Sequence, residues 1–156
     1  MKGNPKIIEV LNQLLNGELT AMDQYFVHAH MYEDWGLNEL YERINHESQD
    51  ERGHAAKLIA RILFLEGKPD IEKRNALTIG KDVQEMLELD LQYEYKVAAS
   101  LRTAIDLCEQ HNDYQTREIL EVLLEETEDD HMHWLEQQVT LIKMIGLQNY
   151  IQTKMS

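Results

Sequence analysis

Apolar residues recur at intervals of three and four along most of this chain, a spacing that places them on one face of an α-helix. Four long stretches carry this pattern, and glycine, proline or short polar segments separate them. We expect long helices over about residues 5–35, 38–66, 82–111 and 113–145, and a short fifth helix over about 147–154. Residues 67–81 have no clear helical period, so we expect a long crossover there.

Capping residues support these limits. Asn4 is a suitable N-cap before Pro5, which fits the first turn of a helix. Gly67 and the proline two residues later end the second stretch, and Asp82 can cap the third. Gly146 ends the fourth stretch, so the short C-terminal segment after it is expected to form a separate helix.

The connections determine how these helices pack. Short links make the first and second helices antiparallel neighbours, and the third and fourth likewise. The long segment between the second and third helices lets the second pair be added through a crossover. A chain of 156 residues is long enough for one domain with a sizeable core. We therefore expect a single all-α domain over residues 1–156, a four-helix bundle with a long crossover and a short fifth helix.

A glutamate interrupts the apolar face of each long helix, where an ionised side chain is costly unless it is paired or bound to metal. The four are Glu18, Glu51, Glu94 and Glu128, and the second and fourth are followed three residues later by His54 and His131. The i, i+3 spacing puts each glutamate and histidine pair on one helical face. Four carboxylates and two imidazoles are the ligands with which four-helix bundles hold two metal ions. They suit iron or manganese, and zinc could occupy the site too.

The two halves of the chain differ by one residue in this spacing. The first glutamate lies 33 residues before the second, whereas Glu94 lies 34 before Glu128. We expect the extra residue to be absorbed between Asn112 and Glu128. If the fourth helix were shifted instead, Glu126 or Glu125 would compete for the same place. We favour Glu128 because only it has a histidine three residues on.

Other polar residues near these positions allow two interpretations. Tyr25 lies two turns from the first glutamate on the same face and could supply an electron or a hydrogen bond. His46 and Asp50 could form an additional metal site on the exposed face of the bundle, or could simply be solvated. His133 is expected to point outward, because it lies about 200° around the helix from His131.

Composition excludes several classes of protein. The formal net charge of −14 argues against a nucleic-acid-binding surface and favours attraction of cations. The single cysteine, Cys108, excludes an internal disulfide framework and a cysteine-rich metal site. The N-terminus lacks the apolar run of a signal peptide, and no segment approaches about 18 apolar residues. We therefore expect a cytoplasmic protein without nucleic-acid or membrane partners.

Several specific stretches resemble bacterioferritins. They are the opening Met-Lys-Gly-x-x-x-x-Ile-x-x-Leu-Asn-x-x-Leu, Asp23-Gln24-Tyr25-Phe26-x-His28, Asp34-Trp35-Gly36-Leu37, His46-Glu47-Ser48, Arg61-Ile62-Leu63-Phe64-Leu65-Glu66-Gly67-x-Pro69 and Gly146-Leu147-Gln148-Asn149-Tyr150. The similarity covers essentially the whole chain, so the chain is identified as a member of this ferritin-like family.

The resemblance implies a hollow shell of twenty-four subunits that oxidises Fe²⁺ with O₂ or H₂O₂ and stores a ferric mineral. The implied di-iron ligands are Glu18, Glu51, His54, Glu94, Glu128 and His131, with Glu51 and Glu128 bridging the two ions. His46 and Asp50 match an inner-surface iron site, and Tyr25 matches a residue used for electron transfer. A ferredoxin-type reductant is implied as a partner. The alternatives are a subunit that sequesters metal without catalysis or a structural subunit of a mixed shell.

One position departs from the haem-binding members of this family. They place a methionine directly after the second-helix ligand glutamate, and two subunits each give one sulfur to the haem iron. Here that position is Arg52, whose protonated guanidinium cannot ligate iron. A shell made of this chain alone is therefore expected to lack the usual haem, or the chain shares its shell with a haem-binding paralogue. A reductant that docks at the haem is in doubt for the same reason.

Overall fold

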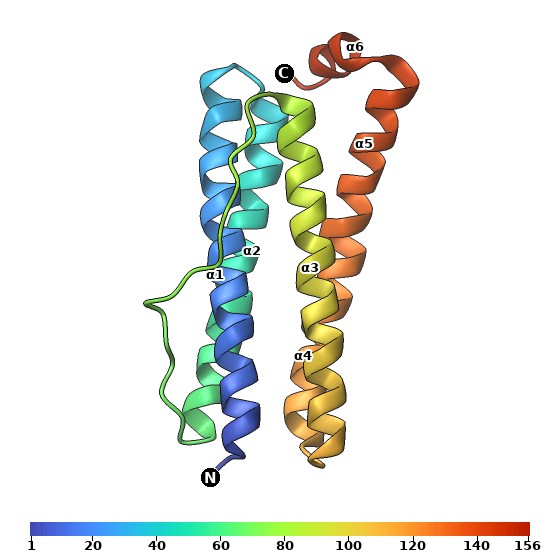
Figure 1. The fold of residues 1–156 in the computed structure, drawn as a ribbon. Coiled ribbons are helices and arrows are strands. Elements are labelled where there is room, and N and C mark those ends of the chain that lie inside the picture. Colours follow the sequence, from blue (N-terminus) through green and yellow to red (C-terminus); the bar gives the residue numbers. More distant parts are fainter.

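The chain folds into four long helices, arranged as two antiparallel pairs joined by a long crossover, and a short fifth helix (Figure 1). The computed structural model describes all residues 1–156. The first three helices are α1 (Pro5–Asp34), α2 (Asn38–Phe64) and α3 (Val83–Gln110). The fourth is continuous but has three parts, α4 (Tyr114–Glu126), the π-helical segment η1 (Thr127–Met132) and α5 (His133–Ile145). The short helix α6 (Leu147–Gln152) follows. The predicted four-helix bundle with a long crossover and a fifth helix is confirmed.

Local chemistry explains where the helices begin and end. The Asn4 side chain accepts a hydrogen bond from the backbone N–H of Lys6 at 2.8 Å, and Asp82 accepts one from Glu85 at 2.9 Å. Gly146 ends the fourth helix with a φ of 83°, a backbone conformation that favours glycine, so the chain turns there into α6. None of the helices is both long and apolar enough to cross a membrane.

The crossover, residues 65–82, runs the length of the bundle beside α1 (Figure 1). Four side chains on one stripe of α1 bind its backbone N–H groups in order along the chain. Asn12 binds Asp70 at 2.8 Å, Thr20 binds Asn75 at 2.8 Å, Gln24 binds Thr78 at 3.2 Å and His28 binds Gly80 at 3.1 Å. The crossover is therefore attached to the first helix at four points along its length.

Two apolar clusters fill the bundle, one toward each end. One contains Leu11, Leu15, Leu58 and Leu101, and the other contains Tyr25, Leu40, Leu87 and Leu135, all almost fully buried. Each fully buried leucine contributes about 1.5–3 kcal/mol. The polar positions expected to bind metal lie between the two clusters along every helix. The apolar ends therefore stabilise the fold around a polar middle layer.

The π-helical segment η1 accommodates the one extra residue by which the interval from Glu94 to Glu128 exceeds that from Glu18 to Glu51. In a π-helical turn the backbone hydrogen bonds span five residues instead of four, so one additional residue fits without breaking the helix. Arg43 of α2 supports this turn by donating to the carbonyl oxygen of Asp130 at 2.7 Å and to Glu47 Oε1 at 2.6 Å. Its guanidinium also lies 4.6 Å from the ring centre of Trp134.

Arg43→Met should destabilise the protein by about 1–3 kcal/mol, because the buried Glu47 and the Asp130 carbonyl each lose their donor. The expected result is a lower midpoint of thermal unfolding. Arg74→Met is the matched control, since Arg74 also binds one carboxylate and backbone carbonyls, but its carboxylate partner Asp23 is partly exposed whereas Glu47 is buried. Equal midpoints for the two variants would show that Arg43 does not stabilise η1.

Candidate metal centre

Five of the six side chains expected to bind metal meet in the polar middle layer of the bundle. They are Glu18 of α1, Glu51 and His54 of α2, Glu94 of α3 and His131 of η1. None of them is more than 4% exposed. Every long helix contributes at least one of these side chains, so the centre exists only when the bundle is assembled.

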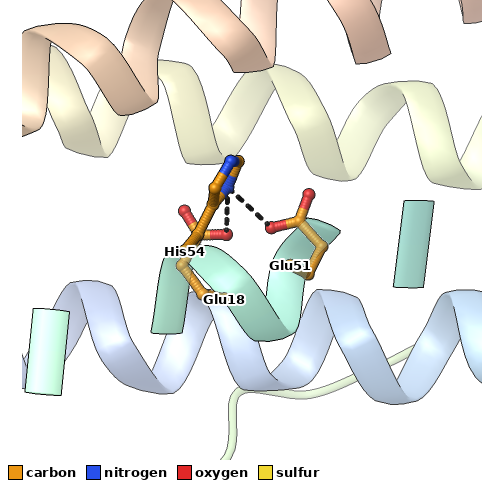
Figure 2. A group of neighbouring side chains, drawn as sticks. All are labelled: Glu18, Glu51 and His54. Carbon is orange, nitrogen blue, oxygen red and sulfur yellow. Dashed lines mark ion pairs between the residues drawn. The ribbon is translucent and has the colours of Figure 1, made fainter. Parts of the chain in front are cut away.

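The first group of ligands joins α1 and α2. His54 Nδ1 lies 3.4 Å from Glu18 Oε2 and 3.4 Å from Glu51 Oε2 (Figure 2), without hydrogen-bond geometry to either. Both carboxylate oxygens of Glu18 are buried without a hydrogen-bond partner. Buried polar atoms in proteins are normally paired, so these atoms point to a bound cation.

The second group shares Glu51 with the first. His131 Nδ1 lies 2.8 Å from Glu51 Oε1 and 3.3 Å from Glu94 Oε1. The rings of His54 and His131 stack with their centres 5.9 Å apart. Glu51 therefore lies between two places where a cation can be bound, which is the position of a bridging ligand.

Charge in this layer is compensated by protons when no metal is bound. Burial and the neighbouring Glu51 raise the pKa of Glu18 well above its usual value. Burial alone would lower the pKa of His54, but the contacts with Glu18 and Glu51 outweigh it and raise this pKa to about 11. Burial likewise opposes the charged form of His131, but its four carboxylate neighbours raise its pKa. Two divalent cations would supply the positive charge that these carboxylates require, so the residues fit a metal pair.

Tyr25 extends the centre toward the second apolar cluster. Its hydroxyl is buried and donates a hydrogen bond to Glu94 Oε1. Burial and the charges of Glu94, Asp90 and Glu51 raise the pKa of this phenol, so it keeps its proton at neutral pH. The ring also lies edge-on to His131, with ring centres 6.4 Å apart. Tyr25 therefore lies beside Glu94 and His131, and its role in electron transfer stays a prediction.

Glu128 lies outside the cluster, which corrects the expectation that it faces the core. Its side chain is 38% exposed and accepts a hydrogen bond from Arg102 Nη2 at 2.6 Å. The reason is the wider turn of η1, which brings Thr127 instead of Glu128 to the inward position one turn before His131. Thr127 is fully buried, and its hydroxyl oxygen has no hydrogen-bond partner.

Of the two competing glutamates, one lies beside the cluster. Glu126 Oε2 is 2.7 Å from His54 Nε2, on the side of the ring away from Glu18 and Glu51. Glu125 is exposed. None of Glu125, Glu126 and Glu128 lies among the grouped ligand side chains, so the register of the fourth helix differs from every alternative drawn from the sequence.

Two further acidic side chains, Glu47 and Asp50, lie on the Nε2 side of the His131 ring. Glu47 is buried beside His131 Nε2, and Asp50 Oδ2 lies 3.3 Å from the same nitrogen. The hydrogen bond with His131 lowers the pKa of Asp50. His46 Nε2 lies 3.5 Å from Asp50 Oδ2 and its side chain is 65% exposed. Glu47 was missed as a site residue, although it lies on the same apolar stripe as Glu51.

Comparisons with known proteins extend over the whole chain. The family model described as "Ferritin-like domain" matches residues 8–145. A bacterial ferritin of Synechocystis sp. is 55% identical over 156 residues, which cover 100% of both chains. A bacterial ferritin of Pseudomonas aeruginosa is 52% identical over 154 residues, 99% of each chain. A bacterioferritin of Rhodobacter capsulatus is 43% identical over 150 residues, 96% of this chain and 92% of the relative.

Proposed function

Because this chain belongs to the ferritin-like family and is of the bacterioferritin type, we propose that it stores iron after oxidising Fe²⁺ at the buried centre. The names of its relatives, bacterial ferritin and bacterioferritin, support iron storage. The observation that carries the oxidation step is the set of buried carboxylate oxygens on Glu18, Glu51 and Glu94 that lack hydrogen-bond partners. Unpaired carboxylates beside two imidazoles favour divalent iron over a purely structural role.

We assign five residues as iron ligands. Glu18 and His54 would hold one ion, Glu94 and His131 the other, and Glu51 would bridge them. When bound, two ferrous ions supply one electron each to O₂ or H₂O₂. The carboxylates favour the ferric product, because their negative charge stabilises the more positive ion. The apolar clusters on both sides keep bulk water away from the layer, which strengthens this effect.

We propose supporting roles for Tyr25, His46 and Asp50. The Tyr25 hydroxyl already donates to Glu94, so an electron leaving this ring for the oxidant would leave its proton on that carboxylate. His46 and Asp50 are proposed to bind iron that leaves the centre. Asp50 supports this proposal because it lies between the buried His131 and the exposed His46.

Anaerobic loading of the metal-free protein with Fe²⁺, followed by O₂ or H₂O₂, tests the function by ultraviolet absorbance. We expect a fast phase in which the amount of Fe²⁺ oxidised saturates at about two irons per subunit, as a two-ion centre requires. Oxidation no faster than in buffer would overturn the catalytic role. The chain would then be a metal-sequestering or structural subunit of a mixed shell, which co-purification with a second ferritin chain would identify.

The shell is proposed to contain twenty-four subunits, either all copies of this chain or a mixture with a haem-binding paralogue. It is proposed to receive electrons from a ferredoxin-type reductant. The residue at position 52 affects both the composition of the shell and the docking of the reductant, because both depend on whether haem binds. Arg52 is exposed on α2, and a Cβ added to the neighbouring Gly53 would meet no atom within 4 Å. The position at which the family resemblance implies a haem-ligating methionine is therefore exposed on this chain and carries a guanidinium instead of a thioether.

Arg52→Met should create haem binding in a shell of this chain alone, because a thioether can donate a lone pair to haem iron and a guanidinium cannot. The visible absorbance and the haem-to-protein ratio after reconstitution measure this, with an expected limit of about one haem per two subunits, since each haem needs two sulfur ligands. Arg52→Leu is the control. Haem bound equally by the unsubstituted chain would contradict the assignment of Arg52.

A further inference from the structure

Both histidines of the centre turn one nitrogen inward and the other toward a supporting carboxylate. His54 directs Nδ1 at Glu18 and Glu51, with both distances 3.4 Å, and it directs Nε2 at Glu126 Oε2, 2.7 Å away. His131 repeats the arrangement. Its Nδ1 faces the ligand carboxylates and its Nε2 faces Glu47 and Asp50.

The two histidines differ in how many carboxylates contact their Nε2 atoms. His131 has two supporting carboxylates from α2, and Arg43 holds one of them in place. His54 has only Glu126, the last residue of α4, immediately before η1. Glu126 is the only hydrogen-bond partner of His54 Nε2, so the orientation of this ring depends on one side chain.

A carboxylate accepts hydrogen bonds and cannot donate them, so the proton of a neutral His54 belongs on Nε2. The lone pair of Nδ1 is then free and points between Glu18 and Glu51. Nδ1 itself has no hydrogen-bond partner although it is buried. In metal sites the hydrogen bond made by one ring nitrogen determines which nitrogen binds the metal.

We propose that Glu126 is a positioning residue of the metal centre, which holds His54 through Nε2–H so that Nδ1 binds the metal shared with Glu18 and Glu51. This inference rests on the proposed function of the centre. A simple surface ion pair is the competing explanation, because Lys57 Nζ lies 3.8 Å from Glu126 Oε1. That pair is long and both side chains are partly exposed, so it contributes little. The contact with His54 is short, and its histidine is buried.

Binding of Co²⁺ to the assembled metal-free protein tests this role without oxidation chemistry. Glu126→Leu should weaken one of the two Co²⁺ sites about tenfold or more, the usual cost of losing such a support. Glu126→Gln should restore most of the affinity, because its amide oxygen still accepts the hydrogen bond. Glu125→Leu is the matched control at the exposed neighbouring position, and Lys57→Met removes the competing ion pair. Both controls should bind Co²⁺ as the unsubstituted protein does.

A second measurement follows the proton itself. In the Co²⁺-loaded protein, the N–H proton of each ligating imidazole gives a strongly shifted NMR signal that exchanges with water. Glu126→Leu should accelerate the exchange of one such signal and leave the other unchanged. A general loosening of the helix would affect both signals or neither.

Two outcomes separate the inference from the function. If Glu126→Leu binds Co²⁺ like the unsubstituted protein, while Glu51→Ala loses binding, the positioning role is overturned and the metal centre stands. If Glu51→Ala also binds Co²⁺ normally, the proposed centre itself is overturned. A loss in Glu125→Leu equal to that in Glu126→Leu would also overturn the inference.

Discussion

Glu51→Ala should abolish the fast oxidation of Fe²⁺ and weaken the binding of both metal ions. Glu51 is shared by the two ligand groups, so its loss removes a ligand from each. We expect a decrease of more than about 100-fold in the rate, because losing even a supporting partner of a metal ligand costs about 10–100-fold. Stopped-flow absorbance gives the rate, and equilibrium binding of Co²⁺ gives the affinity. The bundle should stay folded, since the substitution also removes a repulsive neighbour of Glu18.

Glu128→Ala is the informative comparison for Glu51→Ala. Glu128 makes a partly exposed ion pair with Arg102, and such pairs contribute about 0–1 kcal/mol. The fast phase should therefore persist in this variant. If Glu128→Ala abolishes the fast phase as Glu51→Ala does, the fourth helix of the iron-loaded protein has a different register from the one described here.

Deletion of Thr127 should give the centre a second bridging carboxylate. The deletion removes the extra residue that η1 accommodates, so the helix can continue with ordinary α-helical turns. Glu128 then takes the inward place of Thr127, four residues after the buried Leu123 and three before the histidine. Because the centre gains one ligand, we expect it to bind Co²⁺ about tenfold more tightly. The oxidation of Fe²⁺ should also be faster.

Two substitutions separate the new carboxylate from the change in register. Thr127→Glu places a carboxylate at the same inward position without shortening the chain, and it should also tighten Co²⁺ binding. Thr127→Val keeps the shape of the side chain without a carboxylate, and it should not. Weaker Co²⁺ binding in a folded deletion variant would show that Glu128 does not enter the centre.

Periodicity predicts the helices and most of the side chains that meet in the buried centre. A carboxylate on an apolar stripe is a strong signal, because the α-helical repeat fixes which side of the helix it occupies. Glu18, Glu51 and Glu94 were found in this way. His54 and His131 followed from their spacing after a glutamate. For these residues the local pattern and the packed structure agree.

The same reasoning failed where the helix is not an α-helix. The spacing of Glu128 and His131 indicates a shared face only if the turn between them is α-helical, and the structure has a π-helical turn there. The count of 34 residues against 33 revealed the extra residue, but it was expected between Asn112 and Glu128. The π-helical segment instead covers Thr127–Met132, mostly after Glu128. Glu126 was named only as a competitor for the bridging place, because its contact with His54 joins two helices.

The four attachments of the crossover to α1 restrict the length of that segment during evolution. Sixteen residues of helix separate Asn12 from His28, a distance of about 24 Å at 1.5 Å per residue. Ten residues of crossover cover it from Asp70 to Gly80, about 2.4 Å each, against at most about 3.3–3.6 Å for an extended chain. A relative lacking more than about three of these residues could no longer reach both ends. Such a relative would have to give up an anchor on the first helix, whereas insertions could simply loop outward.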